Sequence, residues 1–145
     1  MLLLKGFDFM LDHTDKRILE ELSKNSRMTM KELGEKVHLT GQAAASRVAK
    51  LEDHGVIEGY TIQVNQVKLG CFIHAFINIY INSTYHQPYV SFIKTQANYI
   101  INNYKISGDG CYLLECKFPS HERLDQFLED LNKHANYKLS IVIKK

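Results

Sequence analysis

The sequence of 145 residues predicts an α+β fold in two parts, a winged-type helix-turn-helix followed by a ferredoxin-like βαββαβ arrangement. Two observations support this prediction. Up to residue 57, apolar residues recur at the three- and four-residue spacing of helices. From residue 60 on, alternating apolar residues typical of strands appear, interrupted by two further helical stretches. The composition, with 45% hydrophobic and 23% charged residues, is that of a globular protein.

The first two helices are expected to be short. The first should begin near Thr14 or Asp15 and bury an apolar stripe that includes Ile18. For the second, Thr29 and Glu32 fit a capping box, in which each side chain accepts a hydrogen bond from a free backbone N–H group. This second helix should end near residue 37, and residues 38–39 then form a turn.

The third helix should begin after Thr40, a residue type that is common at helix N-caps. Ala44, Val48 and Leu51 repeat at spacings of four and three, so they should face the core. Gly55 follows at the position where a left-handed residue often ends a helix.

The outer face of this third helix carries small, amide, hydroxyl and cationic side chains, namely Gln42, Ala43, Ser46, Arg47 and Lys50. In a helix that enters the DNA major groove, small residues allow close approach, Gln can pair with adenine, Arg with guanine, and Lys with phosphate. Residues 24–50 also hold six Lys or Arg against two Glu, whereas residues 1–23 hold three against five acidic residues. A solvated helix face would look the same by itself. The two short helices and tight turn before it favour a DNA-binding helix-turn-helix over residues 29–53.

The remaining chain predicts a strand at residues 60–64, a linker at 65–70, and then strand, helix, two strands, helix and strand. Pro88 suits the first turn of a helix at residues 89–96, with Val90, Ile93 and Ala97 inward. Gly108, Asp109 and Gly110 suit a tight hairpin. Strands are expected at residues 71–81, 100–107, 111–118 and 137–143. The last helix is expected at residues 120–131.

The first strand of the second part is expected to have two apolar faces. Phe72, Phe76 and Tyr80 alternate with a row of isoleucines. Helices cover only one face of a βαββαβ sheet, so the aromatic side chains on the other face would be left in water. We expect a second copy of the chain to cover them. A twofold homodimer would present two DNA-reading helices to a pseudo-palindromic site.

From about Leu11 to Ile143, the sequence resembles the Lrp/AsnC (feast/famine) family of transcriptional regulators. The similar residues occur in the same order and spacing throughout the helical part. They are Leu11-Asp12, Asp15, Ile18-Leu19, Arg27, Met30, Glu32-Leu33, Leu39-Thr40, Arg47-Val48, Leu51-Glu52 and Gly55-Val56-Ile57.

The resemblance implies a regulator that binds double-stranded DNA, forms dimers and often octamers, and commonly binds an amino acid between dimers. The residues expected at the DNA are Arg27, Thr40, Gln42, Ala43, Ser46, Arg47 and Lys50. The residues expected to border the effector are Gly108, Asp109, Gly110, Cys111 and Tyr112.

The hairpin departs from the family pattern, which often has Gly, two variable residues, Asp and an aromatic residue. Cys111 stands at the Asp position, and a thiol is a weak hydrogen-bond acceptor. Asp109 lies two residues earlier and is the candidate to compensate. Whether the chain senses an amino acid is therefore open at this point, while the DNA-binding prediction is unaffected.

The expected division is an extension or arm at residues 1–10, the helix-turn-helix at 11–57, a hinge strand and linker at 58–70, and a ligand-sensing and oligomerisation domain at 71–145. Residues 1–9 could be an extension from an upstream start codon, because Met10 resembles a family start. No apolar run is long enough to span a bilayer, so a cytoplasmic location is expected. The three cysteines form no C-x-x-C pair, and no cofactor or metal site is expected.

Two alternatives remain. One is an architectural protein that wraps DNA without a ligand. The other is an enzyme, since siroheme decarboxylases resemble this family in fold. The seven histidines are scattered and form no H-x-x-x-H spacing, which makes the enzyme the more remote alternative.

Overall fold

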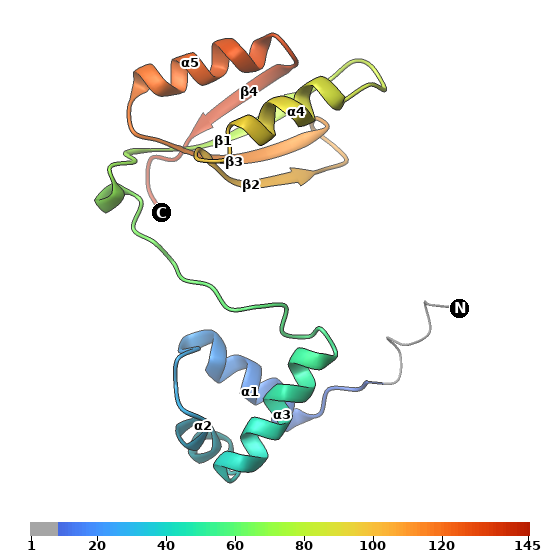
Figure 1. Ribbon diagram of the computed structural model, residues 1–145, viewed down its shortest axis with the longest axis vertical. Coiled ribbons are helices and arrows are strands. Elements are labelled where there is room, and N and C mark those ends of the chain that lie inside the picture. The colour runs from blue at the N-terminus through green and yellow to red at the C-terminus, as the bar shows by residue number, and fades with distance from the viewer. Residues whose placement is uncertain (1–8) are drawn as a thin grey trace. The chain divides into compact units, whose positions relative to one another are not determined.

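The computed structural model describes residues 9–145 (Figure 1). The chain divides between Gln63 and Val64 into two compact units. The predicted α+β fold is confirmed. The expectations for residues 1–8 lie outside the described part of the chain.

The N-terminal unit contains three helices, α1 (His13–Lys24), α2 (Met30–Val37) and α3 (Gly41–Asp53). Each begins after a residue whose side chain accepts a backbone N–H group of the first turn. These N-caps are Asp12, Thr29 and Thr40. The predicted capping box of α2 is confirmed, and α1 has a second one, formed by Asp12 and Asp15.

The core of this unit is formed by the apolar stripes of the three helices. Its buried members are Ile18, Leu22, Met28, Leu33, Val37, Ala44, Val48 and Leu51. Full burial of each large aliphatic side chain contributes about 1.5–3 kcal/mol. The outward face of α3 is therefore fixed by the burial of its opposite face.

The turn between α2 and α3 depends on two glycines that the sequence analysis did not single out. A Cβ atom at Gly34 would lie 2.4 Å from the carbonyl oxygen of Leu39, and one at Gly41 would lie 3.3 Å from the backbone of Lys31. His38 adopts a left-handed conformation, with φ 61°. The two helices can approach this closely because both contact positions lack a side chain.

The predicted strand at residues 60–64 is wrong for the described chain. The segment has no assigned secondary structure, and Tyr60, Ile62 and Val64 are exposed. The alternation that predicted a strand is present, but a strand also requires a hydrogen-bonded neighbour. No assigned strand of residues 9–145 pairs with this segment.

The C-terminal unit starts with a short 3-10 turn, η1 (Val67–Leu69), and has the predicted βαββαβ order. Its sheet has the strand order β2-β3-β1-β4 with antiparallel neighbours, and both helices cover one face (Figure 1). Its elements are β1 (Ile73–Tyr80), α4 (Gln87–Thr95), β2 (Ile100–Lys105), β3 (Tyr112–Phe118), α5 (His121–Asn132) and β4 (Asn136–Ile141).

Two details of this unit differ from the sequence-based expectation. Ala97 lies beyond α4 and is exposed, while Tyr89 is fully buried in its place. The last strand ends at Ile141, and Ile143 is 99% exposed. Alternation alone does not show where a neighbouring strand stops.

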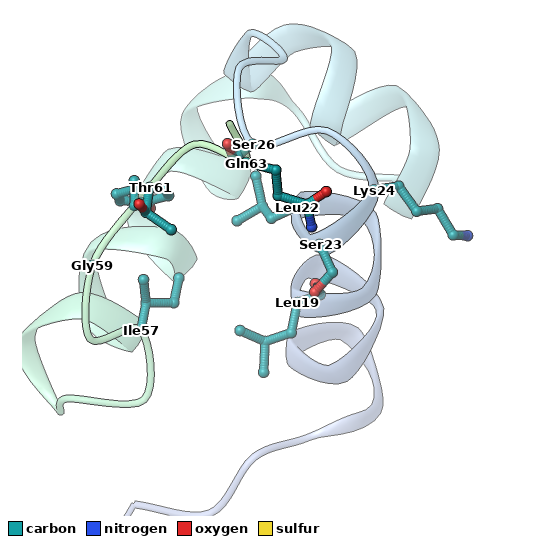
Figure 2. Close-up of a pocket in the computed structure, with 10 residues that line it drawn as sticks. Leu19, Leu22, Ser23, Lys24, Ser26, Ile57, Gly59, Thr61 and Gln63 are labelled. Atoms are coloured by element: carbon teal, nitrogen blue, oxygen red, sulfur yellow. The ribbon is translucent and has the colours of Figure 1, made fainter. Parts of the chain in front are cut away.

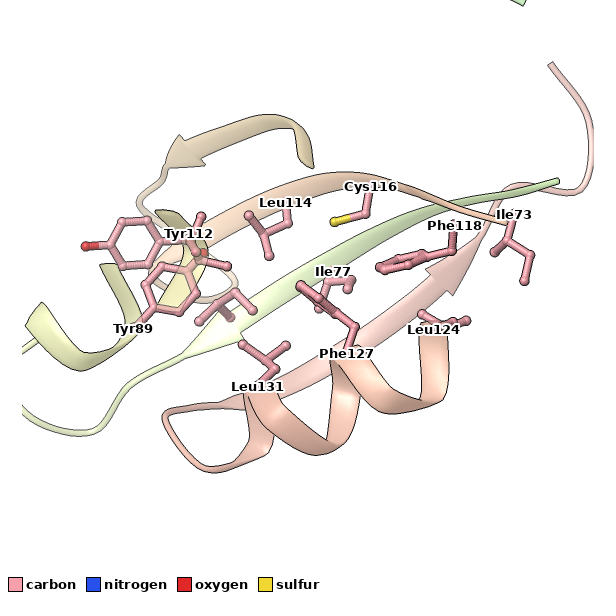
Figure 3. Packing of buried hydrophobic residues seen from close by; sticks show 12 residues of the cluster. Ile73, Ile77, Tyr89, Tyr112, Leu114, Cys116, Phe118, Leu124, Phe127 and Leu131 are labelled. Atoms are coloured by element: carbon pink, nitrogen blue, oxygen red, sulfur yellow. The ribbon is translucent and has the colours of Figure 1, made fainter. Parts of the chain in front are cut away.

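The second core lies between the sheet and the two helices (Figure 3). The inward residues of β1 and β3 pack against Leu124, Phe127 and Leu131 of α5 and against Tyr89 of α4. The rings of Phe118 and Phe127 have centroids 5.1 Å apart. All large inward side chains of β1 and β3 are thus used on this face, and the opposite face carries the residues available to a partner. No helix within residues 9–145 is long and apolar enough to cross a membrane.

Candidate nucleic-acid interface and effector-binding hairpin

The outer face of α3 presents the side chains expected to read DNA. Gln42, Ser46 and Lys50 are exposed and follow one another at four-residue spacing, which places them on one side of the helix. Ala43 is half-buried beside them. Ala49, which the sequence analysis did not select, is also exposed and adds a small residue to this face. An amide, a hydroxyl and an amine are thereby aligned with little bulk between them.

Thr40 lies at the start of α3 and acts there as its N-cap. Its hydroxyl oxygen accepts the N–H group of Ala43 at 3.1 Å. The remaining free N–H groups of the first turn point out of the helix end, where they favour an anion such as a phosphate. Thr40 therefore fixes the start of α3 by capping it.

Arg27 lies in the loop before α2. It is exposed, and its backbone N–H group donates to the side chain of Asn25 at 3.0 Å. This turn fixes the backbone at Arg27 and leaves the guanidinium group in solvent. The position suits a phosphate contact, because a long cationic side chain can reach the DNA backbone without reading a base.

Arg47 occupies a different environment from the other predicted DNA-binding residues. Its Nη1 atom donates to Asp12 Oδ2 at 2.6 Å and to Asp15 Oδ1 at 3.1 Å. The hydrogen bond from Arg47, followed by that from the Asp15 backbone, lowers the pKa of Asp12. The two carboxylates raise the pKa of Arg47 in turn. The sequence pattern indicated the cation but gave no signal for its partners, which precede it by more than thirty residues.

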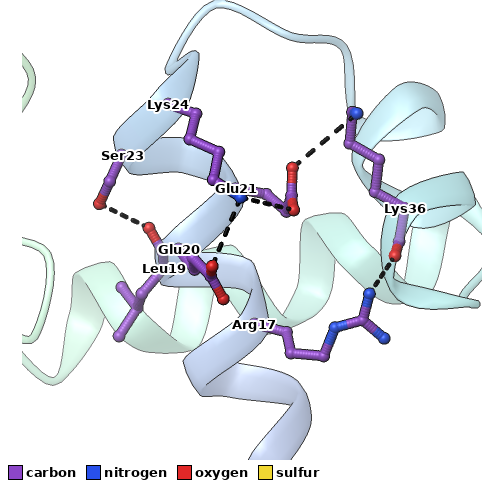
Figure 4. A network of polar contacts seen from close by, with 7 residues as sticks. All are labelled: Arg17, Leu19, Glu20, Glu21, Ser23, Lys24 and Lys36. Atoms are coloured by element: carbon purple, nitrogen blue, oxygen red, sulfur yellow. Dashed lines mark hydrogen bonds and ion pairs between the residues drawn. The ribbon is translucent and has the colours of Figure 1, made fainter.

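A second set of polar contacts joins α1 to α2 (Figure 4). Arg17 Nη2 donates to the carbonyl oxygen of Lys36 at 2.8 Å, which satisfies one of the free carbonyls at the end of α2. Lys36 Nζ lies 3.9 Å from Glu21 Oε2, a long contact between an exposed lysine and a half-buried glutamate. Helix α1 is thus bonded to both helices of the helix-turn-helix.

A hollow of about 440 Å³ lies between α1 and the segment that leaves α3 (Figure 2). Leu19 and Ile57 supply apolar walls, and Ser23, Lys24 and Gln63 supply polar ones. None of its lining residues is acidic. It separates the exit segment from α1, and none of the predicted site residues lines it.

The hairpin between β2 and β3 has the predicted glycine conformations, with φ 125° at Gly108 and φ 103° at Gly110. A Cβ atom at Gly110 would lie 2.8 Å from the carbonyl oxygen of Ile79, so only glycine fits there. The N–H group of Cys111 donates to that same oxygen at 2.7 Å. The hairpin is therefore bonded directly to the end of β1.

Asp109 at the tip of the hairpin is engaged by residues of the neighbouring strands. Tyr80 donates its hydroxyl proton to Asp109 Oδ1 at 2.5 Å, and Asn78 Nδ2 donates to the Asp109 carbonyl at 2.9 Å. Lys138 Nζ lies 3.9 Å from the same carboxylate and 5.4 Å from the centroid of the Tyr80 ring. The carboxylate is exposed and has an amine and a hydroxyl beside it.

The other two predicted effector residues lie away from this cluster. Cys111 is half-buried, with its Sγ atom 3.7 Å from the carbonyl oxygen of Ile81. Tyr112 faces the helix side of the sheet, where its ring contacts Tyr89 and its hydroxyl hydrogen-bonds to His86 Nδ1 at 3.0 Å. The structure therefore brings Gly108, Asp109 and Gly110 together and places Tyr112 in the core. The described residues contain no group of three His, Cys, Asp or Glu side chains that could hold a metal ion.

Comparison with known proteins assigns each unit to a class. Residues 11–58 match the family described as winged helix-turn-helix DNA-binding, and residues 74–145 match the Lrp/AsnC ligand binding domain. The chain thus combines a DNA-binding helix-turn-helix with a ligand-binding α+β domain. It belongs to the Lrp/AsnC family of transcriptional regulators. The predicted family is confirmed.

Individual relatives agree with this assignment. The HTH-type transcriptional regulator LrpA of Bacillus subtilis (strain 168) is 74% identical over 136 residues, which cover 94% of this chain and 100% of LrpA. The solved structure of B. subtilis LrpC has a TM-score of 0.87 at 32% identity and covers 94% of this chain and 97% of LrpC. A regulator of Neisseria meningitidis, solved in complex with L-methionine, has a TM-score of 0.85 at 26% identity, covering 94% and 92% of the two chains. These relatives favour a regulator over the architectural and enzymatic alternatives.

Proposed function

We propose that this regulator recognises specific DNA sequences through the outer face of α3 and changes its DNA binding when an amino acid binds near the Gly108 hairpin. The observation that carries the DNA part is the alignment of Gln42, Ser46 and Lys50 on a helix that is bonded in place. Gln42 and Ser46 can hydrogen-bond base edges, and Lys50 can bind a phosphate or a guanine. Thr40, Ala43 and Arg27 support the contact by capping, close approach and phosphate binding.

Footprinting on many unrelated DNA fragments tests this part of the proposal. A specific regulator protects one or a few pseudo-palindromic sites, with half-sites about one helical turn apart in a twofold dimer. An architectural protein protects every fragment with a regular phase. Phased protection of all fragments would refute sequence-specific recognition by α3.

The open face of the sheet supports a homodimer. Phe72 is 68% exposed, and Phe76, Tyr80 and Leu113 lie on the same side as Tyr104. A patch of this kind is usually covered by a partner. A second copy could cover it in a twofold arrangement, which pairs the same surface with itself.

The polar groups on that face are compatible with burial. His74 Nε2 lies 2.7 Å from Glu115 Oε2, and Asn102 Nδ2 donates to Glu115 Oε1 at 2.8 Å. Partial burial raises the pKa of Glu115, but the hydrogen bonds from Asn102 and His74 outweigh it and leave that pKa below its usual value. A carboxylate that already has two partners costs less to cover than one without partners.

The amino-acid part rests on the chemistry of the hairpin tip. The Asp109 carboxylate can accept hydrogen bonds from the ammonium group of an amino acid, and the Lys138 amine can donate to the carboxylate of the same amino acid. The Neisseria relative was solved with L-methionine. Calorimetry with each of the twenty amino acids, run beside light scattering, tests whether a ligand binds and whether it changes the oligomer. If none of the twenty binds to the wild-type protein, the amino-acid part fails while DNA recognition stands.

A further inference from the structure

Arg47 is bonded to the capping box of α1. Asp12 is the N-cap of that helix, and Asp15 is the residue whose side chain accepts the Asp12 N–H group in return, at 3.2 Å. A single nitrogen of Arg47 donates to both carboxylates. The first turn of α1 and the middle of α3 are thereby connected at one point, although 32 and 35 residues separate the partners in the sequence.

Burial shows why this connection is needed. The Asp15 side chain is only 10% exposed, and Asp15 is the one charged residue that is buried among residues 9–145. A buried carboxylate without a cationic partner is strongly unfavourable. Arg47 is the cation that compensates it, and its own side chain is only 34% exposed. Its neighbour Val48 points into the core, so Arg47 lies on the flank of α3, between the buried stripe and the outer face.

We infer that Arg47 is a positioning residue that locks the orientation of α3 against α1, and that base recognition is carried by Gln42, Ser46 and Lys50 instead. This inference rests on the proposed function, in which α3 reads the DNA bases. An arginine that reads guanine uses two donor nitrogens at once. The Nη1 atom of Arg47 is already bonded to two carboxylates, so the end-on pair of Nη1 and Nη2 is not available to a guanine, and moving the guanidinium to DNA would leave Asp15 buried without its partner.

The variant Asp12→Asn distinguishes a positioning role of Arg47 from a DNA-reading role, because the two roles predict opposite changes in DNA affinity. Asn keeps the N-cap, because its side-chain oxygen can still accept the Asp15 N–H group. It loses the bond to Arg47, because its other side-chain atom is an amide nitrogen. If Arg47 reads DNA, this variant frees a cation and removes a negative charge, so affinity rises. If Arg47 positions α3, affinity falls several-fold. The matched control is Glu20→Gln, which removes an exposed charge from α1 that contacts only Lys24.

Arg47→Lys and Arg47→Ala give a second, independent readout. One ammonium group can replace the single nitrogen that makes both observed bonds, whereas it would weaken a guanine contact made through two arginine nitrogens. Positioning therefore predicts that Lys retains the base preference and most of the affinity. Ala should weaken binding to all sequences alike, with no change in the slope of affinity against salt, whereas loss of a phosphate contact would reduce that slope by about one.

The measurement is fluorescence anisotropy of the full chain with a duplex enriched by the wild-type protein from random sequences, and with single-base-pair variants of that duplex. Thermal melting shows that each variant is folded. If Arg47→Ala does not fold, Asp12→Asn and Arg47→Lys still distinguish positioning from base reading. Tighter binding by Asp12→Asn, or loss of preference at one base pair in Arg47→Lys, would overturn the inference. Failure of the wild-type protein to enrich any duplex would refute the proposed function itself.

Discussion

Single atoms at the turn between α2 and α3 decide how closely the two helices approach. The position of Gly34 has no space for a β-carbon, because the Leu39 carbonyl oxygen would lie 2.4 Å from it. The N–H group of Leu39 also donates to the Gly34 carbonyl at 2.8 Å, so the contact cannot open without losing a hydrogen bond. The orientation of α3 therefore depends on a hydrogen atom at Gly34 as well as on its apolar stripe.

Gly34→Ala is expected to destabilise the N-terminal unit by about 1–3 kcal/mol, the usual cost of forcing extra atoms into a packed contact. Hydrogen exchange of the amides of Leu33 and Ala44 in the full chain measures the effect on this unit. The control is Gly59→Ala, since a β-carbon there meets no atom within 4 Å. Equal exchange in the two variants would show that the α2–α3 turn tolerates a wider spacing.

Burial also governs the reactivity of the cysteines. The pKa of the fully buried Cys116 thiol is raised to about 12, because burial and then the nearby Glu115 disfavour its thiolate. At mildly alkaline pH, Cys116 should resist alkylation in the native protein, whereas the half-buried Cys71 and Cys111 should react first. Mass spectrometry of peptides after timed iodoacetamide treatment measures this order. Labelling of Cys116 as fast as Cys71 would contradict the packing of β3.

At the scale of elements, the helices were predictable because their signals are local. Capping residues and apolar spacing lie within a few positions of each other, and they located all three helices of the N-terminal unit to within about two residues. The strand at residues 60–64 was not predictable in this way, because pairing depends on a neighbour that the local pattern does not contain. The ion pair of Arg47 escaped prediction for the same reason, since Asp12 and Asp15 are distant in sequence.

The capping box of α2 gives a prediction at this scale. The Thr29 hydroxyl oxygen accepts the Glu32 N–H group at 3.1 Å, and Glu32 accepts the Thr29 N–H group at 3.0 Å. Thr29→Ala should destabilise α2 by about 1 kcal/mol. Thr29→Ser keeps the hydroxyl and should exchange its α2 amides as slowly as the wild type. If Ala and Ser behave alike in hydrogen exchange, the cap contributes nothing to the helix.

At the scale of the whole molecule, the apolar patterns predicted the order of elements and the resemblance predicted the family, but the resemblance did not distinguish the environments of individual residues. Gly108, Asp109 and Gly110 lie at the hairpin tip as expected, while Tyr112, assigned to the effector on the same basis, is buried against Tyr89. The alternation of β3 already carried that information, since Tyr112, Leu114 and Cys116 occupy its inward positions. Periodicity was the better guide to side-chain direction, and resemblance the better guide to function.

The open sheet face gives the prediction for the assembly. Phe76 lies in the middle of β1 on that face, with Glu115 and Ser140 as its neighbours on the adjoining strands. Phe76→Asp should convert the proposed dimer into a monomer, because it adds a charge where apolar surface would be covered. Tyr85→Asp is the control, since Tyr85 is exposed in the loop before α4. Sedimentation over a range of concentrations measures the change. A wild-type monomer, or a dimer unaffected by Phe76→Asp, would rule out this interface.

The hydrogen bond between Tyr80 and Asp109 has an optical consequence. The chain has no tryptophan and eight tyrosines, so its ultraviolet fluorescence comes mainly from tyrosine. A phenol bonded to a carboxylate emits weakly, because the excited hydroxyl transfers its proton to the acceptor. An amino acid that took Asp109 as its partner, as proposed above, would release Tyr80 and raise the tyrosine emission without any attached dye. Tyrosine emission would then report the occupancy of the proposed site, and Tyr80→Phe would remove that signal while keeping the ring beneath Lys138.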